Sequence, residues 1–149
     1  MAHTTDLLMS IRRIARLYEG MLKKISGRYQ LTPIEANIIS FLQNNPGKDT
    51  AADIVELRML SKGAVSQAVE SLIQKSLLQR RQDTVDRRKI HLSILPAARP
   101  ITEEIDALRL EFREIVFSGF TEEERELFFA LNDRIMANTK SSLERGESV

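Results

Sequence analysis

Residues 61–95 constrain the fold of this chain more than any other stretch. They open with apolar side chains at three- and four-residue steps, the period of a helix with one buried face: Val65, Val69, Leu72 and Ile73. They close with strict alternation over residues 89–94, the pattern of a half-buried strand. A strand at Leu77–Arg81 and a basic loop at Gln82–Arg88 lie between them. The stretch therefore predicts a helix followed by a β-hairpin.

The alternation assigns a side to each residue of the second strand. Ile90, Leu92 and Ile94 share the face that we expect to be buried. Lys89, His91 and Ser93 share the other face, and we interpret His91 as an ordinary exposed residue. Of the neighbours Arg80 and Arg81, we expect one to face phosphate and the other to pair with an acid.

The polar side of the predicted helix carries short or polar residues at its N-terminal end: Ser61, Lys62, Gly63, Ser66 and Gln67. Ser61 is placed to cap the helix by accepting a backbone N–H. A slim polar helix end of this kind can enter a major groove, and a basic hairpin beside it can reach the backbone or the minor groove. The pair of elements therefore favours DNA as the partner.

Charge supports this interpretation. Residues 61–91 contain seven basic and three acidic side chains, a local charge of +4, whereas the whole chain of 149 residues carries only +1. Positive charge is thus concentrated where phosphates would lie. Adjacent arginines often form only a solvated charge run, but Arg87 and Arg88 stand at a hairpin tip after a helix of the recognition type.

Capping signals place the other helices. Thr32, Pro33 and Glu35 predict a helix start with a capping box, and the turn 45–47 predicts its end. A short helix is expected at Ala51–Leu57, capped by Thr50 with Asp53 in its first turn, and the link Arg58–Leu60 fits a helix-turn-helix.

Long amphipathic patterns flank this unit, at Thr5–Ile25 and Ile101–Ser118 and in a last helix after the capping box of Thr121–Glu124. Pro100 predicts a kink or a later helix start, and Gly119 a C-cap. Five of the eight aromatic residues lie in the last two helices. A symmetric dimer would bury these faces and place two recognition helices about 34 Å apart for a palindrome. The alternative is that these helices fold back on their own winged domain.

Composition excludes several function classes. The chain has no cysteine and only two, widely separated histidines, so thiol and multi-histidine sites are missing. No Gly-rich phosphate loop is present, and the clustered glutamates sit in first helical turns. We therefore expect no enzymatic activity, no metal and no cofactor. The absence of cysteine, of a long apolar run and of a signal peptide predicts a cytoplasmic protein that does not enter a membrane.

In element order the chain resembles the MarR family of bacterial transcription regulators. The segments that carry the resemblance are LTPIEANIISFL, ADIVELRMLSKGAVSQAVESLIQKSLLQRR and DRRKIHLSI. The family's Asp-x-Arg wing signature corresponds to Asp86 and Arg88. The resemblance implies that this arginine enters the minor groove and that the aspartate orients the wing. It also implies a homodimer, usually a repressor, often released by a small phenolic or other anionic ligand bound between the winged and dimerisation regions.

Three positions depart from the family pattern. Gln67 stands where many relatives carry arginine, which changes the expected base preference from guanine towards adenine. Ile94-Leu95 replaces a Leu-Thr pair and removes the usual cap of the next helix. Ser76 replaces a glycine after the recognition helix, so it must either adopt the turn or extend the helix.

Together these observations predict a mainly α fold with a small β-hairpin wing. We expect an N-terminal dimerisation helix (1–30), a winged helix-turn-helix DNA-binding domain (31–95) and C-terminal dimerisation helices (96–149). The predicted function is a homodimeric, sequence-specific regulator, expected to be a ligand-responsive repressor, that binds a palindromic operator with helix 61–76 in the major groove and wing 82–89 at the minor groove. The residues expected at DNA are Ser61, Lys62, Gly63, Ser66, Gln67, Arg80, Asp86, Arg87, Arg88 and Lys89. The alternative is a winged helix used only for protein–protein contact.

Overall fold

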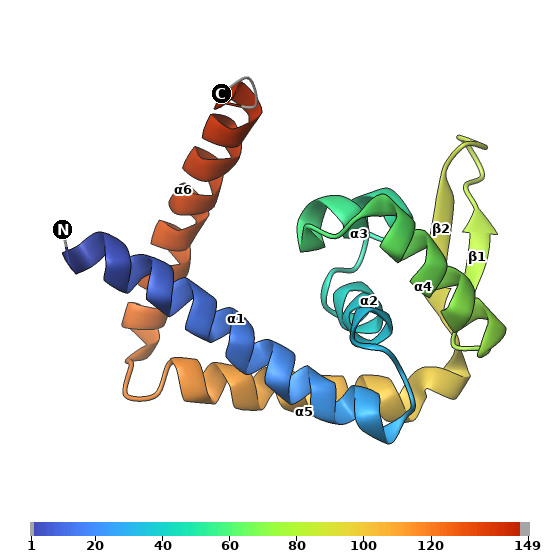
Figure 1. Cartoon of the computed structure of the whole chain (residues 1–149), viewed down its shortest axis with the longest axis horizontal. Helices are drawn as coiled ribbons and strands as arrows, with labels where there is room; N and C mark the ends of the chain where they lie inside the picture. The colour runs from blue at the N-terminus through green and yellow to red at the C-terminus, as the bar shows by residue number, and fades with distance from the viewer. Residues whose placement is uncertain (1, 147–149) are drawn as a thin grey trace. The chain divides into compact units, whose positions relative to one another are not determined.

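The structure is a computed structural model that describes residues 2–146, which are mainly helical with one antiparallel β-hairpin (Figure 1). The elements are α1 (Ala2–Arg28), α2 (Pro33–Asn44), α3 (Ala51–Arg58), α4 (Lys62–Gln74), β1 (Leu78–Gln82), β2 (Ile90–Ile94), a short 3-10 turn η1 (Pro96–Ala98), α5 (Arg99–Val116) and α6 (Glu122–Gly146). The predicted fold class is therefore confirmed. Within this part of the chain no helix combines the length and apolar character that crossing a membrane requires.

The chain forms two compact units, one ending at Phe112 and the other starting at Arg113. The first unit holds α1 to β2 and most of α5, and the second holds the end of α5 and all of α6. The elements that carry the predicted DNA contacts all lie in the first unit.

Three predicted helix starts are confirmed, each as a reciprocal capping box: Thr32 with Glu35, Thr50 with Asp53, and Thr121 with Glu124. In each box the threonine hydroxyl accepts the backbone N–H three residues later, and the acid accepts the backbone N–H of the threonine. These signals are local in sequence, so they persist in the fold without help from distant residues.

Helix α4 ends at Gln74, two residues before the predicted end. Ser76 adopts a left-handed conformation with φ +61°, which supplies the turn that a helix end needs. The N–H groups of Ser76 and Leu77 then donate to the carbonyls of Ile73 and Leu72 at 2.9 and 3.0 Å. Of the two alternatives for Ser76, the turn is the one that holds.

Of the two alternatives predicted from Pro100, a kink or a later helix start, the structure shows the later start. The 3-10 turn η1 precedes α5, which starts at Arg99, so Pro100 lies in the first helical turn, where no N–H is needed. Gly119 has φ +83° in the turn after α5, consistent with its predicted role at the helix end. Helix α1, at Ala2–Arg28, extends beyond the predicted Thr5–Ile25 at both ends.

The core of the first unit joins all of its helices to the hairpin. Its largest fully buried side chains come from α2 to α5 and β1 and include Phe41, Ile38, Ile39, Ile54, Leu72, Leu78 and Ile105. Leu22 and Ile25 of α1 pack into the same cluster, as do Ile101 and Leu108 of α5. The C-terminal part of α1 and the first part of α5 therefore fold back on the winged domain, as the alternative to dimerisation predicted.

The hairpin pairs Leu78 with Ile94 at its base and Gln82 with Ile90 next to the turn. Leu92 is buried and Ile94 is half-buried, as the alternation predicts. Ile90 is exposed, which corrects the prediction for this residue. The reason is its position beside the projecting turn, beyond the reach of the helical core.

Candidate nucleic-acid interface

Helix α4 presents its N-terminal polar end to solvent. Ser61 caps this end, with its hydroxyl accepting the N–H of Ala64 at 3.2 Å. The predicted contact residues that follow, Lys62, Gly63, Ser66 and Gln67, are all exposed. The opposite face is held down by buried apolar side chains: Val65, Ala68, Val69 and Leu72. The polar residues are thus displayed on a rigid helix.

The C-terminal end of α4 is tied to α2 by a polar contact that the sequence analysis missed. The side chain of Glu35 is 1% exposed and accepts hydrogen bonds from Ser71 Oγ at 2.6 Å and from Lys75 Nζ at 3.0 Å. Lys75 also donates to the carbonyl of Gln30 at 3.1 Å. The helical spacing of Ser71 and Lys75 puts them on one side of α4, but only the fold brings Glu35 there.

The two arginines of β1 are distinguished by their partners. Arg80 forms an ion pair of 2.5 Å with Glu70 of α4. We expected one of the two arginines to pair with an acid and the other to face phosphate. Arg80 is the one paired with an acid, and the exposed Arg81 is left as the candidate for phosphate contact. The pair also joins the hairpin to the recognition-type helix.

The turn of the wing is organised by Asp83. Its Oδ2 accepts the N–H groups of Val85 and Asp86 at 2.9 and 2.7 Å. The backbone closes the turn with Asp83 N–H to Lys89 O at 2.9 Å. These backbone hydrogen bonds and the contact with His91 hold the pKa of Asp83 well below its usual range.

Asp86 and Arg88 lie together at the tip. Asp86 Oδ1 accepts the Arg88 N–H at 3.0 Å and lies 3.5 Å from Arg88 Nε. The Arg88 side chain is 94% exposed, so its outer guanidinium edge is open to a ligand. Arg87 and Lys89 are exposed beside it, and Gln82 Nε2 donates to the Arg87 carbonyl at 2.9 Å.

His91 corrects a prediction. Although it lies on the outward face of β2, its side chain is only 15% exposed and lies between two carboxylates. Nδ1 is 2.6 Å from Asp49 Oδ1, and Nε2 is 2.7 Å from Asp83 Oδ1. The interpretation as an ordinary exposed residue is wrong, because the loop before α3 covers that face, with Leu92 N–H donating to Asp49 O at 2.8 Å.

The predicted contact residues gather at two places in the first unit, the N-terminal end of α4 and the hairpin turn. In Figure 1 both places lie on the side of this unit away from α5. Arg80 does not lie at the tip; it is in β1, paired with Glu70 of α4.

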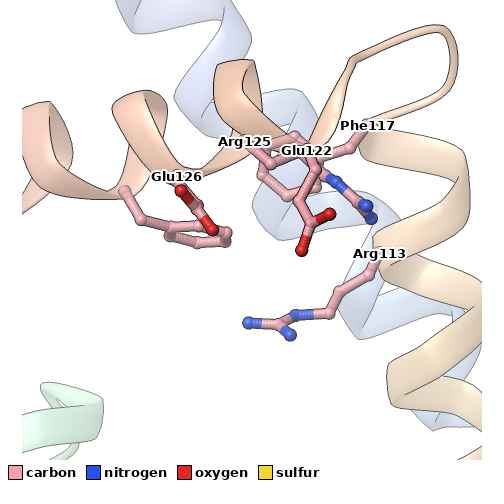
Figure 2. Close-up of a pocket in the computed structure, with 6 residues that line it drawn as sticks. Arg113, Phe117, Glu122, Arg125 and Glu126 are labelled. Atoms are coloured by element: carbon pink, nitrogen blue, oxygen red, sulfur yellow. The ribbon is translucent and has the colours of Figure 1, made fainter.

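The second unit has a separate hollow with charged walls. It is lined by Arg113 and Phe117 from the end of α5 and its turn, and by Glu122, Arg125, Glu126 and Phe129 from α6. Figure 2 shows Arg113 and Glu122 projecting into the same space. The Arg113 guanidinium lies 5.3 Å from the ring centre of Phe129. Because acidic and aromatic side chains stand beside the basic ones, we do not interpret this hollow as a phosphate site.

Exposed apolar side chains follow the two long helices. They include Leu7, Leu8, Met9 and Ile11 of α1 and Leu127, Leu131, Ile135, Met136 and Leu143 of α6. Within the described residues α6 has no buried side chain at all. Such continuous apolar faces are typical of surfaces that a partner covers.

Residues 29–89, which include this candidate interface, are similar to known proteins. A family model described as MarR family matches residues 29–89, which span α2 to the wing. The HTH-type transcriptional regulator YsmB of Bacillus subtilis is 25% identical over 126 residues, covering 85% of this chain and 86% of that protein. Over residues 29–89 this chain therefore matches the MarR family. It is a DNA-binding transcription regulator with a winged-helix fold.

Several solved structures have the same fold as this chain over most of their length. A MarR-family regulator from Listeria monocytogenes, solved with a 26mer DNA, superimposes with a TM-score of 0.77 at 15% identity, covering 95% of this chain and 93% of that one. Bordetella bronchiseptica BpsR, studied for regulation of its DNA binding by 6-hydroxynicotinic acid, gives 0.64 at 21% identity, covering 88% and 98%. At this identity these similarities establish the fold.

Proposed function

We propose that the protein is a homodimeric, sequence-specific regulator that binds a palindromic operator. In this proposal α4, within the predicted recognition helix 61–76, enters the major groove, and the wing 82–89 contacts the minor groove. The observation that carries the proposal is the pairing of an exposed, capped polar helix end with an arginine-tipped turn in one compact unit. The match to the MarR family and the DNA complex of the Listeria relative support it.

Each side chain has a distinct role in this proposal. Lys62 and Ser66 offer donors to phosphates and base edges, and Gln67 can pair with adenine through two hydrogen bonds. Ser61 and Gly63 permit close approach because neither carries a bulky side chain. Arg88 reaches into the minor groove with Asp86 orienting it, and Arg87 and Lys89 contact the flanking phosphates.

Selection of duplexes from a random pool tests this function directly. We expect recovered sequences to contain an inverted repeat, and we expect affinity for them to fall steeply as salt rises, because phosphate contacts release counterions. A winged helix used only for protein contact predicts neither enrichment nor a salt-dependent complex.

We propose that α1, the end of α5 and α6 form the dimer interface, which matches the assignment of residues 1–30 and 96–149 to dimerisation. The exposed apolar faces of α1 and α6 support this, as does the aromatic cluster of Phe117, Phe120, Phe128 and Phe129 in the second unit. A partner subunit would also fix the spacing of the two recognition helices.

We further propose that a small aromatic or anionic effector controls a repressor. The supporting observation is a polar cluster between α1, α2 and α3, where Arg58 Nε and Asn44 Oδ1 are buried without a hydrogen-bond partner among the described residues. Burial lowers the pKa of Arg58, whose guanidinium lies 5.4 Å from the ring centre of Phe41. An anion would compensate this desolvated charge.

Titration calorimetry with 6-hydroxynicotinic acid and with benzoate tests the effector site. We expect one or both to bind the wild type and to reduce operator affinity. We expect Arg58→Met to abolish binding, whereas Arg99→Met, a change at an exposed arginine, preserves it. Equal binding by both variants would remove Arg58 from the proposal.

A further inference from the structure

His91 connects the wing to the body of the first unit. Its two ring nitrogens contact different carboxylates, Asp49 in the loop before α3 and Asp83 at the start of the wing turn, at 2.6 and 2.7 Å. Within residues 2–146 no group of histidine and acidic side chains is arranged to hold a metal ion, so these contacts are hydrogen bonds in their own right.

The contacts continue from His91 to the tip of the wing. Asp83 uses its second oxygen, Oδ2, to accept the N–H groups of Val85 and Asp86. Asp86 in turn accepts the N–H of Arg88 at 3.0 Å. A change at His91 is therefore passed through one carboxylate to the backbone that carries the proposed minor-groove arginine.

The charge on the imidazole decides how many of these contacts can form. A neutral imidazole has one N–H, and its other nitrogen is an acceptor. When ionised, Asp49 and Asp83 can accept hydrogen bonds but cannot donate them. A neutral His91 can therefore donate to one of them and must face the other with a lone pair. Only the imidazolium can donate to both.

The charged groups around the ring favour the imidazolium. The hydrogen bonds to Asp49 and Asp83 raise the pKa of His91 above its usual value, against the opposing effects of burial and of Arg81, its cross-strand partner. In α2, which packs against β2, the single charged side chain is Glu35, and it is engaged by Ser71 and Lys75.

Helix α3 also packs against β2 and contributes Asp53, Glu56 and Arg58. Asp53 accepts the Thr50 N–H and Arg58 lies over Phe41. Neither of these two is among the groups that shift the pKa of His91.

We propose that protonated His91 is a positioning residue that locks the wing in place for operator binding, and that its deprotonation releases the wing and weakens the complex. The inference rests on the proposed contact between the wing and DNA. Since the folded-state pKa is raised, the lock is complete below the ordinary histidine pKa and is lost as the pH rises through the higher folded value.

Nuclear magnetic resonance on the free protein tests the lock without DNA. The chain has two histidines, so His3→Gln leaves His91 as the only imidazole. We expect the ¹⁵N order parameters of residues 83–89 to fall in step with the titration of the His91 ring. Order parameters that stay constant through that titration would overturn the proposal.

Fluorescence anisotropy with a selected operator duplex tests the consequence for binding. From about pH 6 to about pH 9 at fixed salt, the wild type should lose affinity by roughly three- to tenfold, the ratio that one net hydrogen bond supports. The matched control His3→Gln should show the same loss. His91→Gln should bind at all pH values as weakly as the wild type does at high pH.

Asp49→Asn provides a second, conservative variant. Its amide can either donate or accept, so it can satisfy a neutral His91, and the pH-dependent loss should become smaller and move to lower pH. The proposal is overturned if His91→Gln keeps the wild-type slope. A complete lack of sequence-specific binding by every variant at every pH would instead refute the proposed function, which makes the two failures distinguishable.

Discussion

The carboxylate of Glu35 in α2 accepts a hydrogen bond of 3.0 Å from the ammonium of Lys75 at the end of α4. The same carboxylate accepts from Ser71 and caps its own helix through the Thr32 N–H. Although burial raises the pKa of Glu35, the hydrogen bonds from Ser71, Thr32 and Lys75 outweigh it and lower the pKa below the usual value. One buried acid thus fixes both a helix start and the far end of the recognition-type helix.

Replacing Glu35 should therefore destabilise the fold. Glu35→Gln places an amide N–H₂ or a neutral oxygen against Lys75, and we expect the free energy of unfolding to fall by about 1–3 kcal/mol at neutral pH. Because the pKa is lowered, the stabilisation is present above the ordinary glutamate pKa and is lost as the pH falls through the lowered value. Urea denaturation at several pH values should show this acid-side loss in the wild type and less of it in the variant. The exposed Glu103→Gln is the control, and equal stability of both variants would contradict the role of Glu35.

Arg88→Ala should weaken operator binding by about tenfold while the protein stays folded. The reason is the loss of the exposed guanidinium that we place in the minor groove. Anisotropy at fixed salt measures the effect, and Arg99→Ala, which removes another exposed arginine, from α5, should leave affinity unchanged. An unaltered affinity for Arg88→Ala would exclude the wing contact.

Gln67→Ala should relax the preference for one base pair in each half-site, because the bidentate contact to a base edge is lost. Selection from a random duplex pool measures the preference at each position. Gln74→Ala changes the same residue type at the other end of α4, where it is exposed but outside the predicted contact set. Identical selected sequences for Gln67→Ala and wild type would remove Gln67 from base readout.

Light scattering should give twice the chain mass of 17.0 kDa for the wild type. Leu131→Glu, in the exposed apolar face of α6, should shift the population to monomer, since burying a charge at that surface costs several kcal/mol. Val85→Glu adds the same charge at the wing turn, outside the elements of the proposed interface, and should remain dimeric. A wild-type monomer at micromolar concentration would refute the dimer.

Much of the architecture is predictable because its signals are local. The capping box at Thr32 and the half-buried strand around Leu92 depend on neighbours within a few residues. The polar end of α4 is equally readable, because helical periodicity separates Ser66 and Gln67 from the buried Val65 and Val69. The prediction failed at Ile90, because alternation specifies a face but not how far the core extends along it.

By itself, the sequence determined the order of the helices, the hairpin and the polar end of α4, since each follows from periodicity, capping and charge over short spans. Only the tertiary structure decided which groups meet: Glu35 with Lys75, Arg80 with Glu70, and His91 with Asp49 and Asp83. Glu35 and Lys75 are 40 positions apart, and Asp49 and His91 are 42 apart. Packing of the intervening helices sets such distances, and no local pattern encodes them.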